Sequence, residues 1–283
     1  MELLYKDKSV IVCKKPAGLV SEGGSGMGMP DLLGKELAAA GEPSLLYPVN
    51  RLDREAEGLL LLARDEQAAA ALSRQAAEHL MEKEYLAIVS GEPEEASGIY
   101  RDLLFHDRNK NKTYVTDRMR KGVKEAVLRY RTLGSVNVGD HMNGSAGSGS
   151  ACGGSKNVGK AADGILANGP TDGALTGGKS PQEKRSGGGS PAQESEKKLS
   201  LLQIWLETGR THQIRVQFAS RKMPLFGDGK YGGGPGRLAL QSHRITFRHP
   251  SSGETITVTA PFPAGVPWDL FPETIIDKSG KNG

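Results

Sequence analysis

The chain has 283 residues, of which 37% are hydrophobic and 25% are charged, and its formal net charge is +4 at pH 7. This length allows one large domain or two small ones, and the mild basicity permits a polyanionic partner without requiring one. No apolar run approaches the roughly 20 residues of a membrane-spanning helix, and no targeting segment is visible. The two cysteines, Cys13 and Cys152, match no metal or disulfide spacing. We therefore expect a cytoplasmic protein.

In chain order, the predicted elements are mainly strands with a few helices. Runs of β-forming residues predict strands at 3–5, 10–12, 59–63, 84–89, 201–206, 240–247 and 254–258. The run at 59–63 is short, continuous and bounded by Gly58, which is typical of a strand buried on both faces. Helical spacing predicts helices at 30–40 and 66–82, and Asp65 should cap the second.

The segment directly before the run at 59–63 carries Arg51 and Asp53. Residues two apart in an extended backbone share a face, so these side chains should project together. A charged pair at the end of a buried strand is costly unless it is satisfied or used. These residues alone leave two interpretations open, a functional site or a loop ion pair without a role.

The middle of the chain changes character twice. Between 101 and 124 there are eight lysines and arginines against three aspartates. This bias fits either a solvated strand face or a surface that contacts phosphate. Residues 135–198 contain 15 glycines and nine serines and no aromatic residue, too little apolar surface to offset the entropy of ordering. We predict a low-complexity, disordered insertion within a single domain spanning 1–283, with an interdomain linker as the alternative.

A second polar motif follows the insertion. A helix is expected to begin at Thr211, with its hydroxyl as the cap and Ile214 on the buried side. Arg210, His212 and Arg215 would then lie near the helix start, where phosphate or carboxylate binds readily. An ordinary surface helix is the alternative. No metal-ligand spacing accompanies His212, so a metal site is not expected.

Four motifs, taken together and in their order, are similar to those of one enzyme family. They are Asn50-Arg51-Leu52-Asp53 with Gly58-Leu59-Leu60, then Lys83-Glu84-Tyr85-Leu86-Ala87, then Gly209-Arg210-Thr211-His212-Gln213-Ile214-Arg215-Val216, and then Pro224-Leu225-Phe226-Gly227-Asp228-Gly229-Lys230-Tyr231-Gly232. This pattern resembles the RluA-type RNA pseudouridine synthases, and the resemblance spans nearly the whole chain outside the insertion.

The resemblance implies an α+β fold with a long, mixed, mostly antiparallel sheet, helices on its flanks and a central active-site cleft. It implies a monomeric enzyme that isomerises uridine to pseudouridine in structured ribosomal or transfer RNA. The reaction breaks the bond from ribose to a ring nitrogen and joins the ribose to a ring carbon. Nothing is oxidised and no group is lost, so no cofactor is expected.

The resemblance also implies the site residues. The catalytic set is Asp53, Tyr85 and Arg215. Arg215 would pair with the Asp53 carboxylate and orient it, and Tyr85 would stack on the uracil. The residues implied for RNA binding or base flipping are Arg51, Ile214, Arg210 and His212. Among these, Arg51 would enter the RNA stack when the target uridine is flipped out.

Some features depart from the family pattern. Asn50 stands where histidine is commonest, and Glu57 adds a negative charge near Asp53, which would repel phosphate unless it points away. Glu57 therefore favours an alternative, a catalytically weak or inactive RNA-binding assembly factor. A hydrolase using Asp53 with Glu55 or Glu57 as an acid and base pair is a third interpretation.

Overall fold

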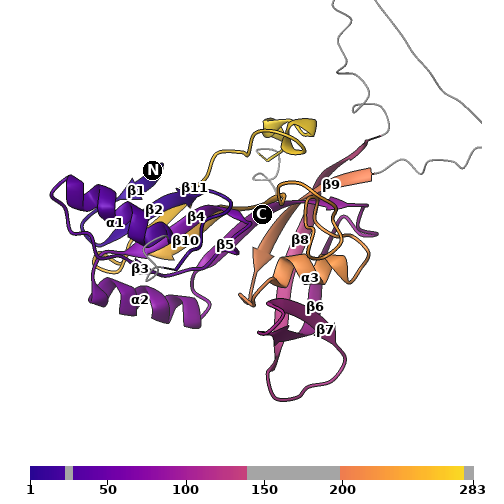
Figure 1. Cartoon of the computed structure of the whole chain (residues 1–283), viewed down its shortest axis with the longest axis horizontal. Coiled ribbons are helices and arrows are strands. Elements are labelled where there is room, and N and C mark those ends of the chain that lie inside the picture. Colours follow the sequence, from indigo (N-terminus) through magenta and orange to yellow (C-terminus); the bar gives the residue numbers. More distant parts are fainter. Residues whose placement is uncertain (23–27, 139–197, 277–283) are drawn as a thin grey trace, which may run out of the picture. The chain divides into compact units, whose positions relative to one another are not determined.

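The computed structural model describes residues 1–22, 28–138 and 198–276, and its framework is one eleven-stranded sheet (Figure 1). The strands are β1 (Leu3–Lys6), β2 (Val10–Lys15), β3 (Tyr47–Pro48), β4 (Glu57–Ala63), β5 (Glu82–Ser90), β6 (Ser97–Asp107), β7 (Lys112–Thr116), β8 (Val123–Asn137), β9 (Lys198–Leu206), β10 (Leu240–Arg248) and β11 (Thr255–Thr259). The main path runs β1-β2-β4-β10-β5-β9-β8-β6-β7, with β3 beside β4 and β11 beside β10. Within the described sheet only β4 and β10 pair in parallel. The predicted α+β class with a mixed, mostly antiparallel sheet is confirmed.

Among the described residues, three α-helices flank this sheet: α1 (Met29–Ala39), α2 (Glu66–Ala77) and α3 (Gln213–Ala219). The predicted cap of α2 is confirmed, because the Asp65 side chain accepts from the Ala68 backbone N–H at 2.8 Å. The predicted end at 82 is wrong, since the chain turns after Ala77 and His79 takes a left-handed conformation with φ of 57°. Across the described ranges, no helix is long and apolar enough to cross a membrane.

Strand β4 is buried on both faces, as its continuous apolar run predicts. Leu59 and Leu61 lie in the apolar cluster that includes α2, whereas Leu60 and Leu62 lie in the cluster that includes α1. The two helices therefore cover opposite faces of this strand, on either side of β4 in Figure 1. Each fully buried leucine contributes about 2 kcal/mol from burial. The burial of these leucines fixes β4, the strand that follows the Arg51–Asp53 segment.

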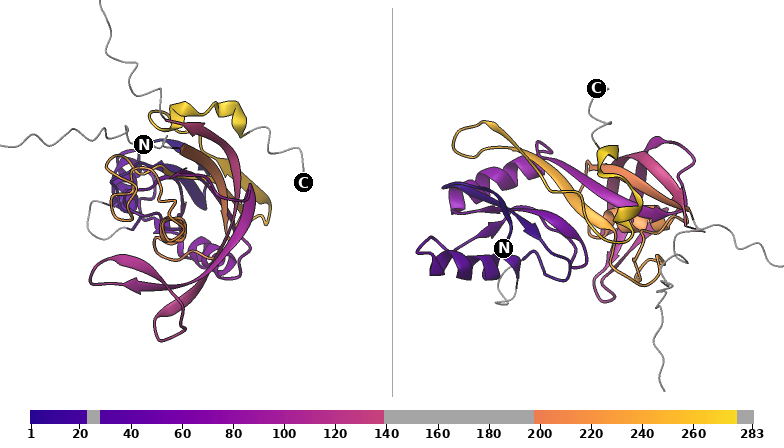
Figure 2. Two further views of the ribbon diagram at one scale, coloured as in Figure 1. Left: turned by 90° about the vertical axis from the view of Figure 1, so that its right-hand side faces the viewer. Right: turned by 90° about the horizontal axis from the view of Figure 1, so that it is seen from above.

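The other half of the sheet is covered by α3 and by the C-terminal segment. Ile214 and Phe218 of α3 pack with Tyr85 of β5, and the strands bend around this helix in Figure 2. Trp268 belongs to a different cluster, with alternate residues of the same strands such as Leu86. Because alternate side chains of a strand point to opposite faces, α3 and the Trp268 segment lie on opposite faces of β5. This arrangement brings α3 next to Tyr85.

The predicted insertion interrupts a strand pair. Strand β8 continues to Asn137 and β9 begins at Lys198, and these two residues are directly paired. The predicted bounds are therefore wrong at both ends, because residues 135–137 and Lys198 belong to the ladder. Val138 is also described, and the remaining residues predicted for the insertion, 139–197, lie outside the part of the chain that the structure describes.

We predict that replacing residues 138–197 with Asn-Gly leaves the thermal midpoint within about 4 °C of the parent or raises it. The direct pairing of Asn137 with Lys198 allows a two-residue turn to close the hairpin. Differential scanning calorimetry of both proteins measures the change. As a control, a longer replacement of 134–201 also removes the buried Leu199 and Leu201 and should lower the midpoint sharply. A collapse with the shorter replacement would place the segment in the core.

Candidate active site

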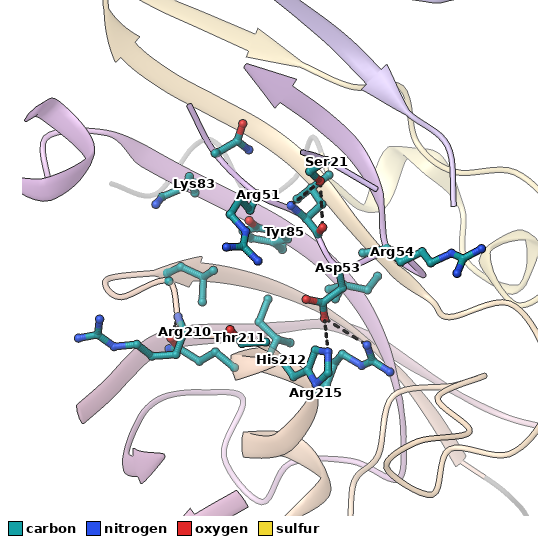
Figure 3. A pocket seen from close by; sticks show the side chains of 18 of the residues that line it. Ser21, Arg51, Asp53, Arg54, Lys83, Tyr85, Arg210, Thr211, His212 and Arg215 are labelled. Carbon is teal, nitrogen blue, oxygen red and sulfur yellow. Dashed lines mark hydrogen bonds and ion pairs between the residues drawn. The ribbon is translucent and has the colours of Figure 1, made fainter. Parts of the chain in front are cut away.

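A pocket of about 490 Å³ lies between the loop before β4, strand β5 and the start of α3 (Figure 3). Small-ligand sites typically have volumes of roughly 300–1,000 Å³, so one nucleotide would fit. All seven residues predicted from the sequence line this pocket: Arg51, Asp53, Tyr85, Arg210, His212, Ile214 and Arg215. Tertiary folding therefore gathers three separate motifs at one place.

The loop that carries Asp53 is fixed, at positions 50 and 52, by hydrogen bonds between side chains and the backbone. The buried Asn50 side chain donates to the Leu59 carbonyl at 3.1 Å and accepts from the Leu61 N–H at 2.8 Å, which extends the edge of β4. Ser21 Oγ both donates to the Leu52 carbonyl and accepts from the Leu52 N–H, each at 2.9 Å. Asn50 thus has a structural task. Asp53 is held on a rigid loop, which site geometry demands.

Lys15 supports the same loop from inside the protein. Its side chain is fully buried, and Nζ donates to the carbonyls of Pro16, Leu19 and Arg54 at 2.9, 2.8 and 3.3 Å. Burial lowers the pKa of Lys15 to about 8, although the nearby carboxylates of the 53–57 loop raise it in part. The ammonium thus joins the loop after β2 to the turn after Asp53.

Arg215 is the centre of an ionic cluster below the pocket. Its Nε and Nη2 donate to the two Asp228 oxygens at 2.7 and 2.8 Å, a bidentate pair that fixes the guanidinium plane. The remaining Nη1 donates to Asp53 Oδ2 at 3.2 Å and to Glu55 Oε2 at 3.1 Å. The expected contact between Asp53 and Arg215 is present, and Figure 3 shows it as a dashed line.

The ionisation of this cluster follows from its geometry. Burial disfavours the charged form of Arg215, but the hydrogen-bonded Asp228 outweighs burial and raises the pKa of the guanidinium. Partial burial raises the pKa of Glu55, but its backbone hydrogen bond and Arg215 outweigh this and lower the pKa overall. Glu55 is therefore held as a carboxylate. An acid and base pair of Asp53 with Glu55 needs a protonated carboxyl, which this arrangement disfavours.

Tyr85 forms an apolar wall of the pocket together with Ile214. Both side chains are buried and belong to one cluster, with Tyr85 only 6% exposed. Burial, reinforced by the Asp53 charge, raises the pKa of Tyr85 well above its usual range, so the phenol remains protonated. A flat, neutral ring beside a carboxylate is suited to stacking against a planar base.

The start of α3 differs from the prediction. The helix begins at Gln213 rather than Thr211. Oε1 of Gln213 accepts a hydrogen bond from the Arg210 backbone N–H at 3.0 Å and so ties the helix start to the preceding turn. His212 precedes the helix in a left-handed conformation and is buried, with 6% exposure. Its Nε2 lies 4.0 Å from Asp53 Oδ2. His212 therefore lies beside Asp53 inside the protein, whereas Arg210 before it is exposed.

Arg51 and Asp53 do not pair with each other. Asp53 contacts Arg215, whereas Arg51 Nη1 forms an ion pair with Glu22 at 2.9 Å, and the Arg51 side chain is 70% exposed. Figure 3 shows Arg51 and Arg210 at different places around the pocket. Arg210 is also exposed, and its Nε donates to the Glu125 carbonyl at 2.9 Å. Both guanidinium groups can thus reach a ligand that enters from solvent.

Glu57 does not disturb the site. It lies at the start of β4, its side chain is 5% exposed, and it forms an ion pair with Arg237. It is absent from the lining of the pocket. The charge that seemed incompatible with an anionic ligand is therefore directed elsewhere and neutralised.

Sequence reasoning missed several residues that build the site. They are Lys15, Lys83, Asp228 and Tyr231, and the contact of Glu55 with Arg215 was also not foreseen. Lys83 lines the pocket, and burial lowers the pKa of its ammonium group. Asp228 and Tyr231 lie in the last of the four motifs, so their positions were visible but their partners were not. A lysine in an apolar strand, as at position 15, was the available sign of a buried cation.

The sequence profile of the family described as RNA pseudouridylate synthase matches residues 9–220 of this chain. The chain belongs to the RNA pseudouridylate synthase family. Members of this family isomerise uridine to pseudouridine in RNA, so the chain is an isomerase of this type.

Named relatives agree with the family assignment. The uncharacterized RNA pseudouridine synthase YhcT of Bacillus subtilis is 26% identical over 93% of this chain and 69% of its own length. The ribosomal large subunit pseudouridine synthase D of Xanthomonas campestris is 28% identical over 93% of this chain and 66% of its own length. This pseudouridine synthase thus spans about two thirds of the length of these relatives.

Solved structures agree on the fold. The human RNA pseudouridylate synthase domain containing 1 superposes with a TM-score of 0.61 over 93% of this chain and 84% of its own, at 16% identity. The human RNA pseudouridylate synthase domain containing 4 gives a TM-score of 0.59 over 93% and 88%, at 17% identity. At these identities the likeness concerns the fold.

We predict that Asp228→Asn lowers the free energy of unfolding by about 3 kcal/mol, because it leaves the buried Arg215 guanidinium without its bidentate partner. Urea unfolding followed by far-UV circular dichroism measures the change. The matched control is Glu207→Gln, which breaks an exposed ion pair with Arg129 and should cost less than about 1 kcal/mol. Equal effects of the two substitutions would contradict the central role of Asp228.

We also predict that Lys15 makes the protein more stable as the pH rises from about 8 to 10.5. In this window the unfolded lysine still binds a proton and the folded one does not, so stability increases with pH. The gain approaches about 3 kcal/mol, and it is absent below pH 8, where both states are protonated. Urea unfolding of the wild type and Lys15→Met across this range isolates the contribution. The prediction would be contradicted if the difference in unfolding free energy between wild type and Lys15→Met did not change with pH.

Proposed function

We propose that this enzyme isomerises a specific uridine in structured ribosomal or transfer RNA and that Asp53 carries the reaction. The observation that supports this most directly is the position of Asp53, at the pocket between the Tyr85 ring and the Arg215 guanidinium. Isomerisation needs one ionised carboxylate close to the glycosidic bond and a planar support for the uracil. Asp53 would supply the carboxylate, and Tyr85 would supply the planar surface.

The base must leave its helix to reach this pocket. We propose that Arg51 enters the vacated place in the RNA stack, since its guanidinium is exposed beside the pocket and is held by a single exposed carboxylate, Glu22. Flipping costs a few kcal/mol, and contacts of this kind offset part of that cost. Ile214 would pack against the flipped base next to Tyr85.

Cations beside the pocket would contact the RNA backbone. Arg210 and Lys83 line it, and Lys230 lies near, with its Nζ donating to the Asn111 carbonyl at 2.9 Å. Basic residues between Arg108 and Lys124, in β7 and the turns on both sides of it, would add to these contacts. Phosphate contacts of this type orient the RNA without reading its sequence. They suit a structured RNA whose shape selects the target.

The proposal includes a cytoplasmic monomer that needs no metal or organic cofactor, because the reaction transfers no electrons and loses no group. A ribosomal target is supported by the relative named as a large subunit pseudouridine synthase. The alternative of an inactive assembly factor depended on Glu57. That residue is paired with Arg237 and does not line the pocket, so no feature of the described residues favours this alternative.

We predict that Asp53→Asn lowers isomerisation by at least ~10⁴-fold while RNA binding changes little, because the carboxylate is reactive and the cations that bind RNA remain. The C5–H bond of uracil breaks in the reaction, so tritium release from C5-labelled transcripts of large-subunit ribosomal RNA and of transfer RNA measures it.

Glu55→Gln is the matched control. It shares Arg215 but should retain activity within about tenfold, whereas an acid or base role for Glu55 would cost ~10²-fold or more. Turnover by Asp53→Asn within a few-fold of wild type would refute the assignment of Asp53.

A further inference from the structure

A chain of polar contacts links Asp53 to strand β7 through His212. Nε2 of His212 lies 4.0 Å from Asp53 Oδ2, and Nδ1 lies 3.0 Å from the Tyr231 hydroxyl. That hydroxyl also accepts from the backbone N–H of Thr113 in β7 at 2.8 Å. These contacts join segments from four parts of the sequence.

The contacts along this chain favour one tautomer of His212. The Tyr231 hydroxyl has one hydrogen, and its oxygen already accepts from the Thr113 N–H. When the hydroxyl donates its hydrogen to His212, Nδ1 is the acceptor. In a neutral imidazole the hydrogen must lie on the other nitrogen, so Nε2–H points to Asp53. The opposite tautomer would direct a lone pair at the carboxylate.

The protein keeps this imidazole neutral and in place. Burial lowers the pKa of His212, Arg215 and Lys230 act in the same direction, and Asp53 opposes them. The rings of His106 and Tyr231 contact the imidazole edge-on, with centroids 6.2 and 5.7 Å away. The ring therefore has little freedom to rotate.

The backbone at His212 points to the same conclusion. Its φ of 53° is left-handed, which is uncommon for a residue other than glycine and costs about 1 kcal/mol or more. Such strain persists where surrounding contacts determine it, often at functional sites. Here it directs the imidazole between Tyr231 and Asp53.

We propose that His212 is a positioning residue, an imidazole fixed as the Nε2–H tautomer by Tyr231, which donates to Asp53 Oδ2 and leaves Oδ1 for the reacting uridine. Arg215 Nη1 contacts the same Oδ2 at 3.2 Å, and within the described ranges no hydrogen bond or ion pair engages Oδ1. Arg215 Nη1 donates to Oδ2 and His212 Nε2 lies on the same side, so a donation from both would hold the orientation of the carboxylate. The contact of 4.0 Å shortens when substrate fills the pocket, as catalytic hydrogen bonds commonly do. This role rests on the proposed function of Asp53.

The test combines kinetics with a direct measurement of the tautomer. His212→Leu removes the donor, and Tyr231→Phe removes the hydroxyl that sets the tautomer. Each should lower kcat for tritium release from C5-labelled large-subunit ribosomal RNA by about 10–100-fold, with KM within about twofold. His212→Gln restores a donor near the Nε2 position and should recover most of kcat. Thermal midpoints of all variants identify any that fail to fold.

The readout that does not depend on activity is the side-chain ¹⁵N spectrum at pH 7.5. We expect His212 Nδ1 unprotonated and Nε2 protonated, with the signal assigned by its absence in His212→Gln. In Tyr231→Phe this preference should weaken, and in the remote control His249→Gln it should persist. An Nδ1–H tautomer, or a kcat for His212→Leu equal to wild type, would overturn the proposal. A wild type inactive on every RNA tested, with the Nε2–H tautomer present, would instead refute the proposed function.

Discussion

The guanidinium of Arg215 is shared by three carboxylates, and the site is organised around it. Asp228 takes two of its nitrogens in a bidentate pair, which leaves Nη1 for Asp53 and Glu55. A buried arginine is costly unless its donors are satisfied, so this cluster must be assembled completely or the fold loses several kcal/mol. The position of the Asp53 carboxylate is thus set by the same cluster that satisfies a buried charge.

The sheet makes this cluster possible by bringing distant segments together. Arg215 and Asp53 are 162 residues apart in the chain, and the contact between them joins the half of the sheet around β4 to the half covered by α3. The loop at Asp53 is held by Asn50 and Lys15, whereas Arg215 is held by its helix and by Asp228. Both partners are therefore preorganised before any RNA arrives.

The residues around Asp53 fall into two groups: those that lie against its carboxylate and those that form the open wall of the pocket. Arg215 and His212 lie toward one carboxylate oxygen, and Tyr85 with Ile214 provides an apolar wall for a base. Arg51 and Arg210 are exposed beside the pocket and can contact a polyanion. Anionic residues that would oppose RNA are neutralised within the protein, as the pairing of Glu57 with Arg237 illustrates. The mild net charge of the whole chain is therefore a poor guide to the charge at the pocket.

The sequence by itself determined most of the local elements and seven of the residues that line the pocket. The run at 59–63 predicted a strand buried on both faces, and four ordered motifs placed Asp53, Tyr85 and Arg215 in one family pattern, because such signals depend on residues close together in the chain. It could not decide which charges pair. Arg51 lies next to Asp53 in sequence but binds Glu22, Glu57 turns to Arg237, and Asp228 rather than Asp53 holds Arg215 most tightly. Only the tertiary structure set these partners and the inward position of His212, because they depend on distances between segments that the sheet brings together.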